Sequence, residues 1–216
     1  MVDIPNGLLR FFDREAYARK FIEGEIRFGL LDRYRKIEGE RKDDTEGRAS
    51  VDWNAKAPQL DIGRSSGHVV AITESDRNIH ADVSSVNRYY ILSTCHPDVS
   101  VQKMATKFKS LFVVRIHDSL GLLERIKAAW QTHPLANAGH AEIIPVVYNK
   151  GGLRDPDPFL ILPSEYSYSQ KPARYEEEKE FRYVLECKVD ATRTWRDSLS
   201  LALGACGDIC SLVPDR

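Results

Sequence analysis

The sequence lacks most features that mark membrane-spanning or secreted proteins. No stretch approaches the roughly 20 apolar residues of a transmembrane helix. The N-terminal MVDIPNGLL has no basic segment followed by an apolar core, so we expect no secretion signal. Only four cysteines occur among 216 residues, too few for a disulfide framework in a chain of this length. We therefore expect a cytoplasmic protein with reduced thiols and no membrane partner.

The sequence also lacks an excess of charge and the common nucleotide-binding signatures. Its 31 Lys and Arg residues and 32 Asp and Glu residues give a net charge of −1, so no global basic field attracts nucleic acid, although a local groove could still be basic. Neither a Gly-x-Gly-x-x-Gly nor a Walker sequence occurs, which leaves Rossmann and P-loop binding unsupported. Cys206 and Cys210 have no histidine nearby, so their spacing favours packing in a helix over zinc binding.

What the sequence does contain is enough apolar residues for one compact domain over 1–216, since 42% of the chain is hydrophobic. Apolar runs and period-two alternation predict strands at 7–12, 25–31, 88–96, 111–116, 142–148, 158–163 and 180–189. Weaker strand signals occur at 49–53 and 68–73. Helical spacing and capping residues predict helices at 13–24, 100–108 and 118–134 and along the C-terminal tail 192–216. We therefore expect an α+β fold with about six to eight strands and three or four helices. Because long connections join many of the strands, a mixed, split sheet is favoured over a doubly wound one.

Two segments are unusually charged. The run YRKIEGERKDDTEG, residues 34–47, is typical of a solvated loop, and the alternative is a lid over a site. The run RYEEEKEFRYVLEC, residues 174–187, places four glutamates directly before an alternating strand. A solvated loop is again the simplest interpretation of this second run, and two catalytic interpretations compete with it.

The first catalytic interpretation is a metal-dependent nuclease. Such a site needs an aspartate on one strand and a Glu-x-Lys on the next, so that two carboxylates hold Mg²⁺ beside a lysine. Glu177 and Lys179 fit the Glu-x-Lys pattern. The matching aspartate would be Asp157, but prolines on both sides of it disfavour a paired strand there.

The second catalytic interpretation is glycosyl transfer through an oxocarbenium ion. A carboxylate against a ribose hydroxyl stabilises the cation as the leaving group departs, and a second carboxylate can serve the incoming nucleophile. Glu178 and Glu180 supply that pair. In an extended chain the two would lie on one side, roughly 6–7 Å apart, with Glu178 on the more mobile side.

The order of motifs resembles the Arg–Ser–Glu branch of the ADP-ribosyltransferase superfamily. An arginine on a first strand, Arg10 in GLLRFF, is followed by a helix and the strand GEIRFG. Ser93 and Thr94 match the first two residues of a Ser-Thr-Ser strand that leads into a helix, with Cys95 in place of the third residue. Glu178 and Glu180 match a Glu-x-Glu ahead of a late strand.

The resemblance implies NAD⁺ as substrate, no metal, and a split mixed sheet on which Arg10, Ser93 and Glu180 converge in one cleft. It assigns Arg10 and Glu180 to NAD⁺ binding and cleavage, Ser93 and Thr94 to support of the cofactor pocket, and Glu178 to presentation of a protein, RNA or DNA acceptor. A surface arginine and a hydrogen-bonded strand hydroxyl are the simpler roles for Arg10 and Ser93.

Other cofactor contacts are less specific. Nicotinamide stacks on an aromatic ring in such sites, for which Tyr34 is our candidate and Tyr89, Tyr90 and Tyr175 are alternatives. Arg27 and Arg35 could contact phosphates, and His96 could touch the cofactor. The chain also resembles a bacterial family with a Glu-x-Glu-x-Arg strand, here completed by Arg182. Some bacterial transferases of the superfamily are toxins or phage-defence effectors, so the likeness implies such a role and a possible antitoxin. A non-enzymatic binding domain is a further alternative.

Overall fold

The computed structural model describes residues 3–31, 48–54, 68–75, 78–85, 88–136, 140–149, 153–154, 166–187 and 195–214. Contacts divide the chain into two compact units. The first unit combines residues 1–30, 89–146 and 177–216, and the second combines 31–88 and 147–176. The sequence analysis did not foresee this division, and a single catalytic domain over 1–216 stays a prediction.

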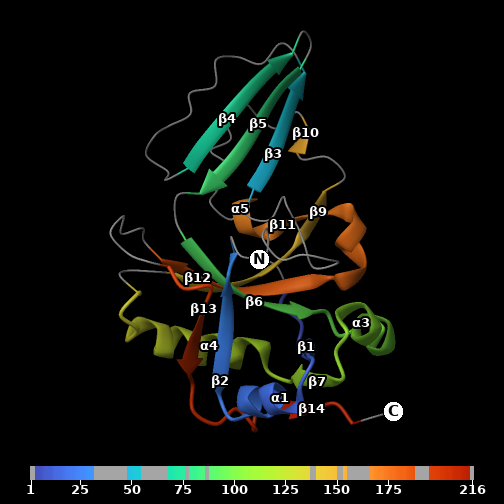
Figure 1. Ribbon diagram of the computed structural model, residues 1–216, viewed down its shortest axis with the longest axis vertical. Coiled ribbons are helices and arrows are strands. Elements are labelled where there is room, and N and C mark those ends of the chain that lie inside the picture. The colour runs from blue at the N-terminus through green and yellow to red at the C-terminus, as the bar shows by residue number, and fades with distance from the viewer. Residues whose placement is uncertain are drawn as a thin grey trace. The chain divides into compact units, whose positions relative to one another are not determined.

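The first unit is built on an eight-stranded sheet that splits along one edge of β6 (Figure 1). Near its start β6 pairs with β2 through Ile91 and Gly29, and at its end it pairs with β1 through Cys95 and Leu9. One arm continues from β2 to β13, the other from β1 to β7 and β14, while β12 and then β8 lie on the opposite edge of β6. The strands are β1 (Leu8–Phe12), β2 (Glu25–Leu30), β6 (Arg88–Cys95), β7 (Phe112–Ile116), β8 (Ala141–Pro145), β12 (Glu180–Cys187), β13 (Ser198–Ala202) and β14 (Cys210–Leu212).

The structure confirms an α+β fold, and the sheet of the first unit is mostly antiparallel where a mixed one was expected. The pairs of known direction in the first unit are antiparallel, and parallel pairs occur in the second unit, between β10 and β3 and between β11 and β9. The more specific expectation, an ADP-ribosyltransferase-like fold, stays a proposal.

In the described part of the first unit three helices accompany this sheet, and two of them start where the sequence predicts. The Ser100 hydroxyl caps α3 (Val101–Phe108) by accepting from the Lys103 N–H, and the Asp118 carboxylate caps α4 (Ser119–Gln131). By contrast, α1 (Glu15–Ile22) has Arg14 at its N-cap, without a side-chain bond, and not the expected Asp13. None of the helices in the described ranges has the length and apolar character that crossing a bilayer requires.

Two apolar clusters pack on opposite faces of β1. Leu8 belongs to the larger cluster, which contains α4 residues spaced four apart, among them Ile126 and Trp130. Leu9 belongs to a smaller cluster that includes Met104 of α3. Because successive strand side chains alternate between faces, membership of a cluster identifies the face on which each residue of β1 and β12 lies.

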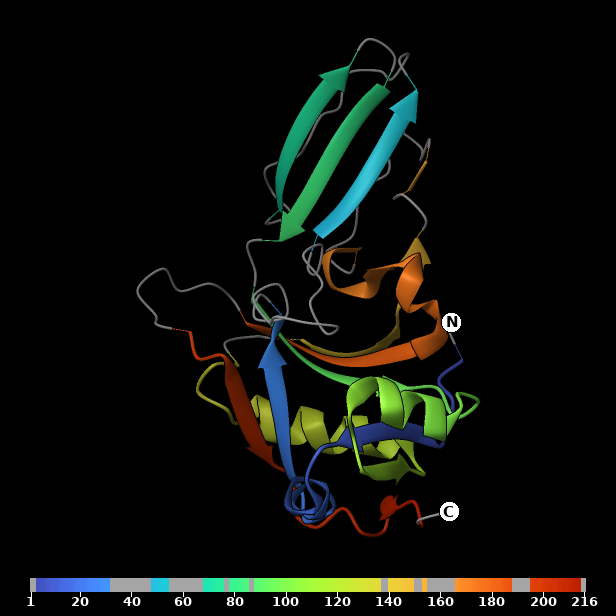
Figure 2. The same cartoon turned by 45° about the vertical axis from the view of Figure 1, so that its right-hand side comes forward.

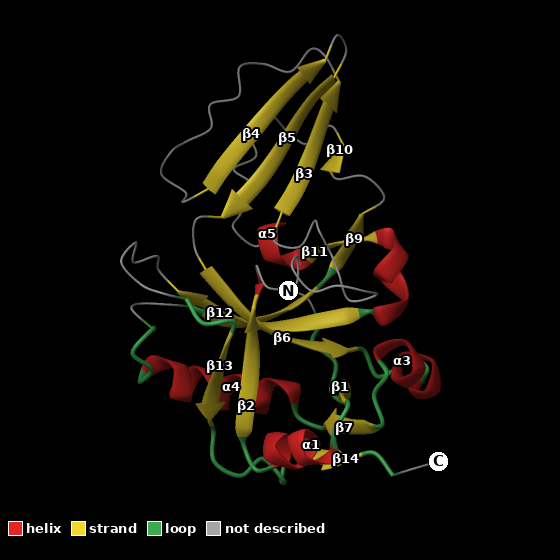
Figure 3. Cartoon of the chain, in the orientation of Figure 1, coloured by secondary structure: helices red, strands yellow, loops and turns green. Residues whose placement is uncertain are grey.

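The second unit contains a smaller sheet with the order β10-β3-β5-β4 and a two-stranded pairing of β9 with β11 (Figure 2). Its strands are β3 (Arg48–Asn54), β4 (His68–Ser75), β5 (Asn78–Ser85), β9 (Val147–Asn149), β10 (Leu153–Arg154) and β11 (Gln170–Pro172). It also holds the helical turn α5 (Tyr166–Ser169), and the 3₁₀ helix η2 (Ala173–Glu178) joins the units along the chain (Figure 3).

The C-terminal tail corrects one prediction. A helix was expected there, but β13 and β14 form strands, and Cys206 and Cys210 are linked in a turn by a Cys210 N–H to Cys206 carbonyl bond of 2.8 Å. Alternating leucines explain the outcome: Leu199 and Leu201 are buried and Ser200 between them is exposed. The predicted strand at 158–163 and the charged run at 34–47 lie outside the described residues.

Candidate functional site at the head of strand β12

The Glu-x-Glu sequence lies in a sharp turn where β12 begins. Glu178 is the last residue of η2, Lys179 adopts a left-handed conformation with φ of 42°, and Glu180 is the first residue of β12. Left-handed backbone is uncommon for a residue with a side chain and often marks functional turns. The expected extended geometry of this pair is therefore wrong, because Glu178 ends a 3₁₀ helix and left-handed Lys179 lies between the two glutamates.

Neighbouring strands fix this turn from both sides. The His96 N–H, at the end of β6, donates to the Lys179 carbonyl at 3.0 Å. On the other side, the Val146 N–H donates to the Glu180 carbonyl at 2.9 Å. The backbone between the two glutamates is thus held by the sheet, and the turn is a fixed part of the fold.

Glu180 forms a buried ion pair within its own strand. Its carboxylate Oε1 accepts from Arg182 Nε at 2.8 Å, and the side chains are only 3% and 1% exposed. The two residues are adjacent on one face because strand side chains repeat every second position. A buried pair of this kind is costly to break, since either partner alone would leave a buried charge.

Glu178 and Glu177 meet two lysines of α3. Lys107 Nζ lies 3.0 Å from Glu178 Oε1 and 2.8 Å from Glu177 Oε1, and Lys103 Nζ lies 2.5 Å from Glu177 Oε2. Glu178, which we expected on the more mobile side of the pair, is buried at the end of η2, whereas Glu177 is partly exposed.

These contacts shift two pKa values. Hydrogen bonds from Lys103 and then Lys107 lower the pKa of Glu177 to about 2. Burial alone would lower the pKa of Lys107, but hydrogen bonds to Glu177 and Glu178 raise it overall. At neutral pH Glu177 is therefore a carboxylate and Lys107 an ammonium group.

The nuclease interpretation gains no support from this arrangement. Both Glu177 oxygens contact lysines, which compete with a metal ion for the same carboxylate. Among the described residues, no three His, Cys, Asp or Glu side chains gather as metal ligands, and Asp157 lies outside those residues.

The Ser-Thr pair lies on β6, next to β12. Thr94 is buried, and its hydroxyl donates to the Phe181 carbonyl at 3.0 Å, which joins β6 to the strand that carries Glu180. Ser93 is half-buried, and its carbonyl accepts from Arg10 Nη1 at 2.5 Å. Cys95 is buried in the smaller apolar cluster. Thr94 is thus the member of the pair with a direct contact to β12 in this structure.

Arg10 lies at the split in the sheet. Ser93 is midway along β6 between Ile91, which pairs with β2, and Cys95, which pairs with β1. The Arg10 guanidinium supplies a donor to the carbonyl in this gap, and it lies 5.7 Å from the centre of the Phe12 ring. The structure thus gives Arg10 a clear structural task, completing the hydrogen bonds where the two arms diverge.

Arg10 and Glu180 differ in how they relate to the larger apolar cluster on their own strands. Leu8 and Phe12, which alternate with Arg10 on β1, pack in the larger apolar cluster, so Arg10 shares their face. Phe181 of β12 belongs to the same cluster, which places Glu180 on the other face of β12. The convergence of Arg10, Ser93 and Glu180 in one cleft stays a prediction, and the side-chain hydrogen bonds of Arg10 and Thr94 link their strands through β6.

The remaining candidates are dispersed. Tyr34 and Arg35 lie outside the described residues, and Arg27 is exposed on β2 opposite Ser200. Tyr90 is fully buried, and its hydroxyl donates to the Arg196 carbonyl.

Three other aromatic candidates, Tyr89, His96 and Tyr175, are buried or contact another side chain of the fold. Tyr89 is buried at the start of β6, and His96 lies near the Phe181 ring, 6.1 Å between centroids. Tyr175 is buried, with the Lys171 ammonium 4.8 Å from its ring centre.

Sequence analysis missed the cations that surround the glutamates. Lys103 and Lys107, four residues apart, occupy one face of α3, a spacing that was visible in the sequence. Arg182 was noted without a role, although its position two residues after Glu180 in an alternating strand places both on one face. Their proximity to the acidic turn depends on the packing of α3, which the sequence does not reveal.

Comparisons with known proteins identify no relative. No protein-family model matches the chain, and neither the curated proteins nor the solved structures searched contain a match.

Proposed function

We propose that this protein is an NAD⁺-dependent ADP-ribosyltransferase whose reaction centre is the turn at the head of β12. The observation that carries the proposal is the pair of buried carboxylates, Glu178 and Glu180, held on either side of left-handed Lys179 and tied to the end of β6. Preorganised charge of this kind is costly to fold and is typical of reaction sites.

Glu180 is suited to the bond-breaking step. Its carboxylate would accept a hydrogen bond from the hydroxyl of the nicotinamide ribose. As the bond between the anomeric carbon and nicotinamide breaks, the electron pair leaves with the nicotinamide nitrogen and positive charge grows on the ribose. A carboxylate held beside that charge lowers the barrier, because the attraction strengthens in the transition state. Arg182 acts as a positioning residue through its bond to Glu180 Oε1.

Glu178 is suited to the acceptor. It lies on the η2 side of the turn, and Lys107 holds its Oε1. From there it would orient the attacking group and take its proton as the new bond to the anomeric carbon forms. Because both carboxylates are buried, a substrate can reach them only if side chains that cover them move aside. The acceptor class, protein, RNA or DNA, is not specified by these residues.

The proposal does not depend on Arg10 as a cofactor ligand. Arg10 bonds the Ser93 carbonyl, and the Thr94 hydroxyl bonds β12. NAD⁺ contacts by Tyr34 and Arg27 stay predictions. A toxin or phage-defence role with an antitoxin partner is part of the proposal and rests on the sequence resemblance; growth arrest on expression of the active protein, relieved in an inactive variant, would test it.

The test is NAD⁺ consumption by the purified full-length protein in EDTA. We expect nicotinamide release that needs no divalent cation, with label from NAD⁺ appearing on a protein or nucleic-acid pool. Nucleic-acid cleavage that requires Mg²⁺ and is lost in Glu177→Ala would favour the nuclease. NAD⁺ binding without turnover, or no binding at all, would favour a binding domain and overturn the proposal.

A further inference from the structure

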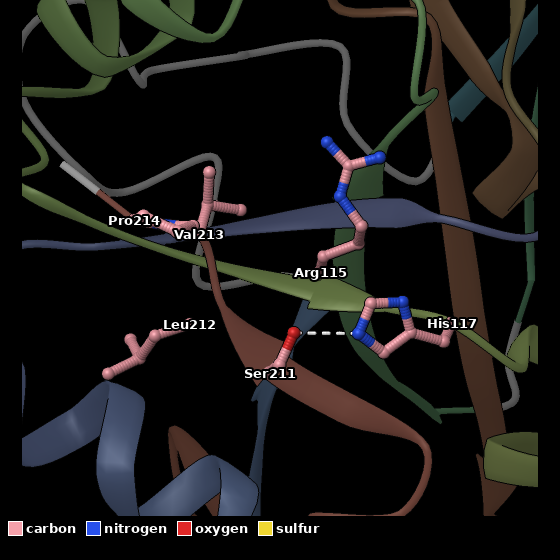
Figure 4. A pocket seen from close by; sticks show the side chains of 6 residues that line it. All are labelled: Arg115, His117, Ser211, Leu212, Val213 and Pro214. Atoms are coloured by element: carbon pink, nitrogen blue, oxygen red, sulfur yellow. Dashed lines mark hydrogen bonds between the residues drawn. The ribbon is translucent and has the colours of Figure 1, made fainter. Parts of the chain in front are cut away.

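A second cluster of polar side chains lies on the edge of the sheet formed by β7 and β14, apart from the head of β12. Arg115 is near the end of β7, and His117, two residues later, follows on the same side because strand side chains alternate. Ser211 of β14 is the direct cross-strand partner of Arg115. The three residues line a pocket of about 310 Å³ together with Leu212, Val213 and Pro214 (Figure 4).

Arg115 is the fixed positive charge among the six residues that line this pocket, and none of the six is acidic. Within the described part of the chain, Arg115 is half-buried and neither it nor His117 forms an ion pair with a carboxylate. This differs from other cations of the same unit, such as Arg125 with Asp208 and Lys107 with Glu178. A half-buried guanidinium is stabilised by a bound anion, so the pocket is suited to anion binding.

The geometry also provides hydrogen-bonding groups beside the cation. The Ser211 hydroxyl and His117 Nε2 lie 2.6 Å apart, and Figure 4 shows them turned towards each other next to the strand that carries Arg115. A serine–histidine pair for acyl transfer would also need a group that orients the imidazole, and no carboxylate contacts His117 among the described residues. Anion binding needs no such group, because the imidazole can donate to the hydroxyl and leave the hydroxyl proton for the anion.

We infer that Arg115, His117 and Ser211 bind a phosphate group, as found in a phosphomonoester. The guanidinium fork takes two phosphate oxygens, and the Ser211 hydroxyl, when it accepts from His117 Nε2, can donate its own proton to a third. A planar carboxylate has only two oxygens and would leave part of the donor set unused. Val213 and Pro214 supply an apolar wall for the group that carries the phosphate. The inference is independent of the proposed transferase activity.

The test is titration of the ¹⁵N-labelled full-length protein with inorganic phosphate and with phenyl phosphate, followed by the amide signals of β7 and β14. We expect saturable shifts at Ser211 and Val213, with tighter binding of phenyl phosphate because its ring can contact the apolar wall. Arg115→Gln should weaken binding about tenfold or more, and Arg115→Lys, which keeps the charge without the fork, should fall between.

Arg14→Gln is the control for loss of one arginine, because Arg14 is an exposed arginine of the same unit that does not line this pocket. It should bind as wild type does. The amide spectrum of each variant reports whether it is folded, so that lost binding and lost structure are distinguished. Non-saturating shifts in the wild type, or equal affinity in wild type and Arg115→Gln, would overturn the inference.

Discussion

The head of β12 and the edge formed by β7 and β14 hold charge in different ways. At the head of β12, Glu178 and Glu180 are buried, and each has a cation from the same chain within hydrogen-bonding distance. At the β7–β14 edge, Arg115 is half-buried without a carboxylate partner among the described residues. The first arrangement has its counter-charges within the fold, which is why we propose it as a reaction site. The second offers a cation without a carboxylate among the described residues, which is why we propose it as an anion-binding site.

The largest effect on stability should come from breaking the buried pair at the head of β12. Arg182→Met leaves Glu180 without its guanidinium partner in a site that is 3% exposed, which should cost about 3–5 kcal/mol in the free energy of unfolding. Denaturant unfolding measures this loss. Glu180→Gln combined with Arg182→Met removes both charges and should be less destabilised than Arg182→Met alone. A single Arg182→Met variant as stable as wild type would show that the pair is not a buried charge pair in solution.

A smaller effect is expected at the split in the sheet. Arg10→Met removes the donor to the Ser93 carbonyl and should cost about 1–3 kcal/mol in unfolding free energy. Arg10→Lys keeps a donor and should lose less. An unchanged melting temperature in Arg10→Met, together with a raised KM for NAD⁺, would contradict the structural role and return Arg10 to the cofactor site.

The strands and helices of the first unit show how far the sequence alone could be taken. Caps at Ser100 and Asp118 and the alternation at Arg88–Cys95 and Glu180–Cys187 placed α3, α4, β6 and β12 well, because those signals are local. The prediction of a helix in the tail was wrong, because Leu199 and Leu201 are buried on either side of exposed Ser200, which is the period of a strand.

The pairing of distant strands and the contacts of the candidate site depend on long-range packing, which the sequence alone does not predict. Leu199 of β13 is placed opposite Phe28 of β2, more than 150 residues away along the chain, and no local pattern encodes that pairing. The candidate site shows the same limit. The glutamates could be found as a motif, but their lysine and arginine partners depend on how α3 and β12 pack.

The smallest expected effect concerns the exposed member of the charge cluster. Glu177 has a folded-state pKa of about 2 against an ordinary 4.5, so its contribution to stability is complete above about pH 4.5 and is lost as the pH falls towards 2. Glu177→Gln should lower the melting temperature by about 1–3 °C at pH 7, because exposed pairs contribute little. Melting curves of both proteins should converge on acidification. A difference that persists unchanged at pH 2 would show that the lysine pairs are not its source.

The central claim is that the glutamates at the head of β12 differ in role, and NAD⁺ turnover by four glutamine variants tests it most directly. Glu180→Gln should lower kcat for nicotinamide release by about 10²–10³ while NAD⁺ still binds. Glu178→Gln should lose transfer to the acceptor and keep much of the hydrolysis, whereas Glu176→Gln and Glu177→Gln should behave almost as wild type does. Four variants with equal NAD⁺ turnover would contradict the account and show that this stretch is only a charged turn.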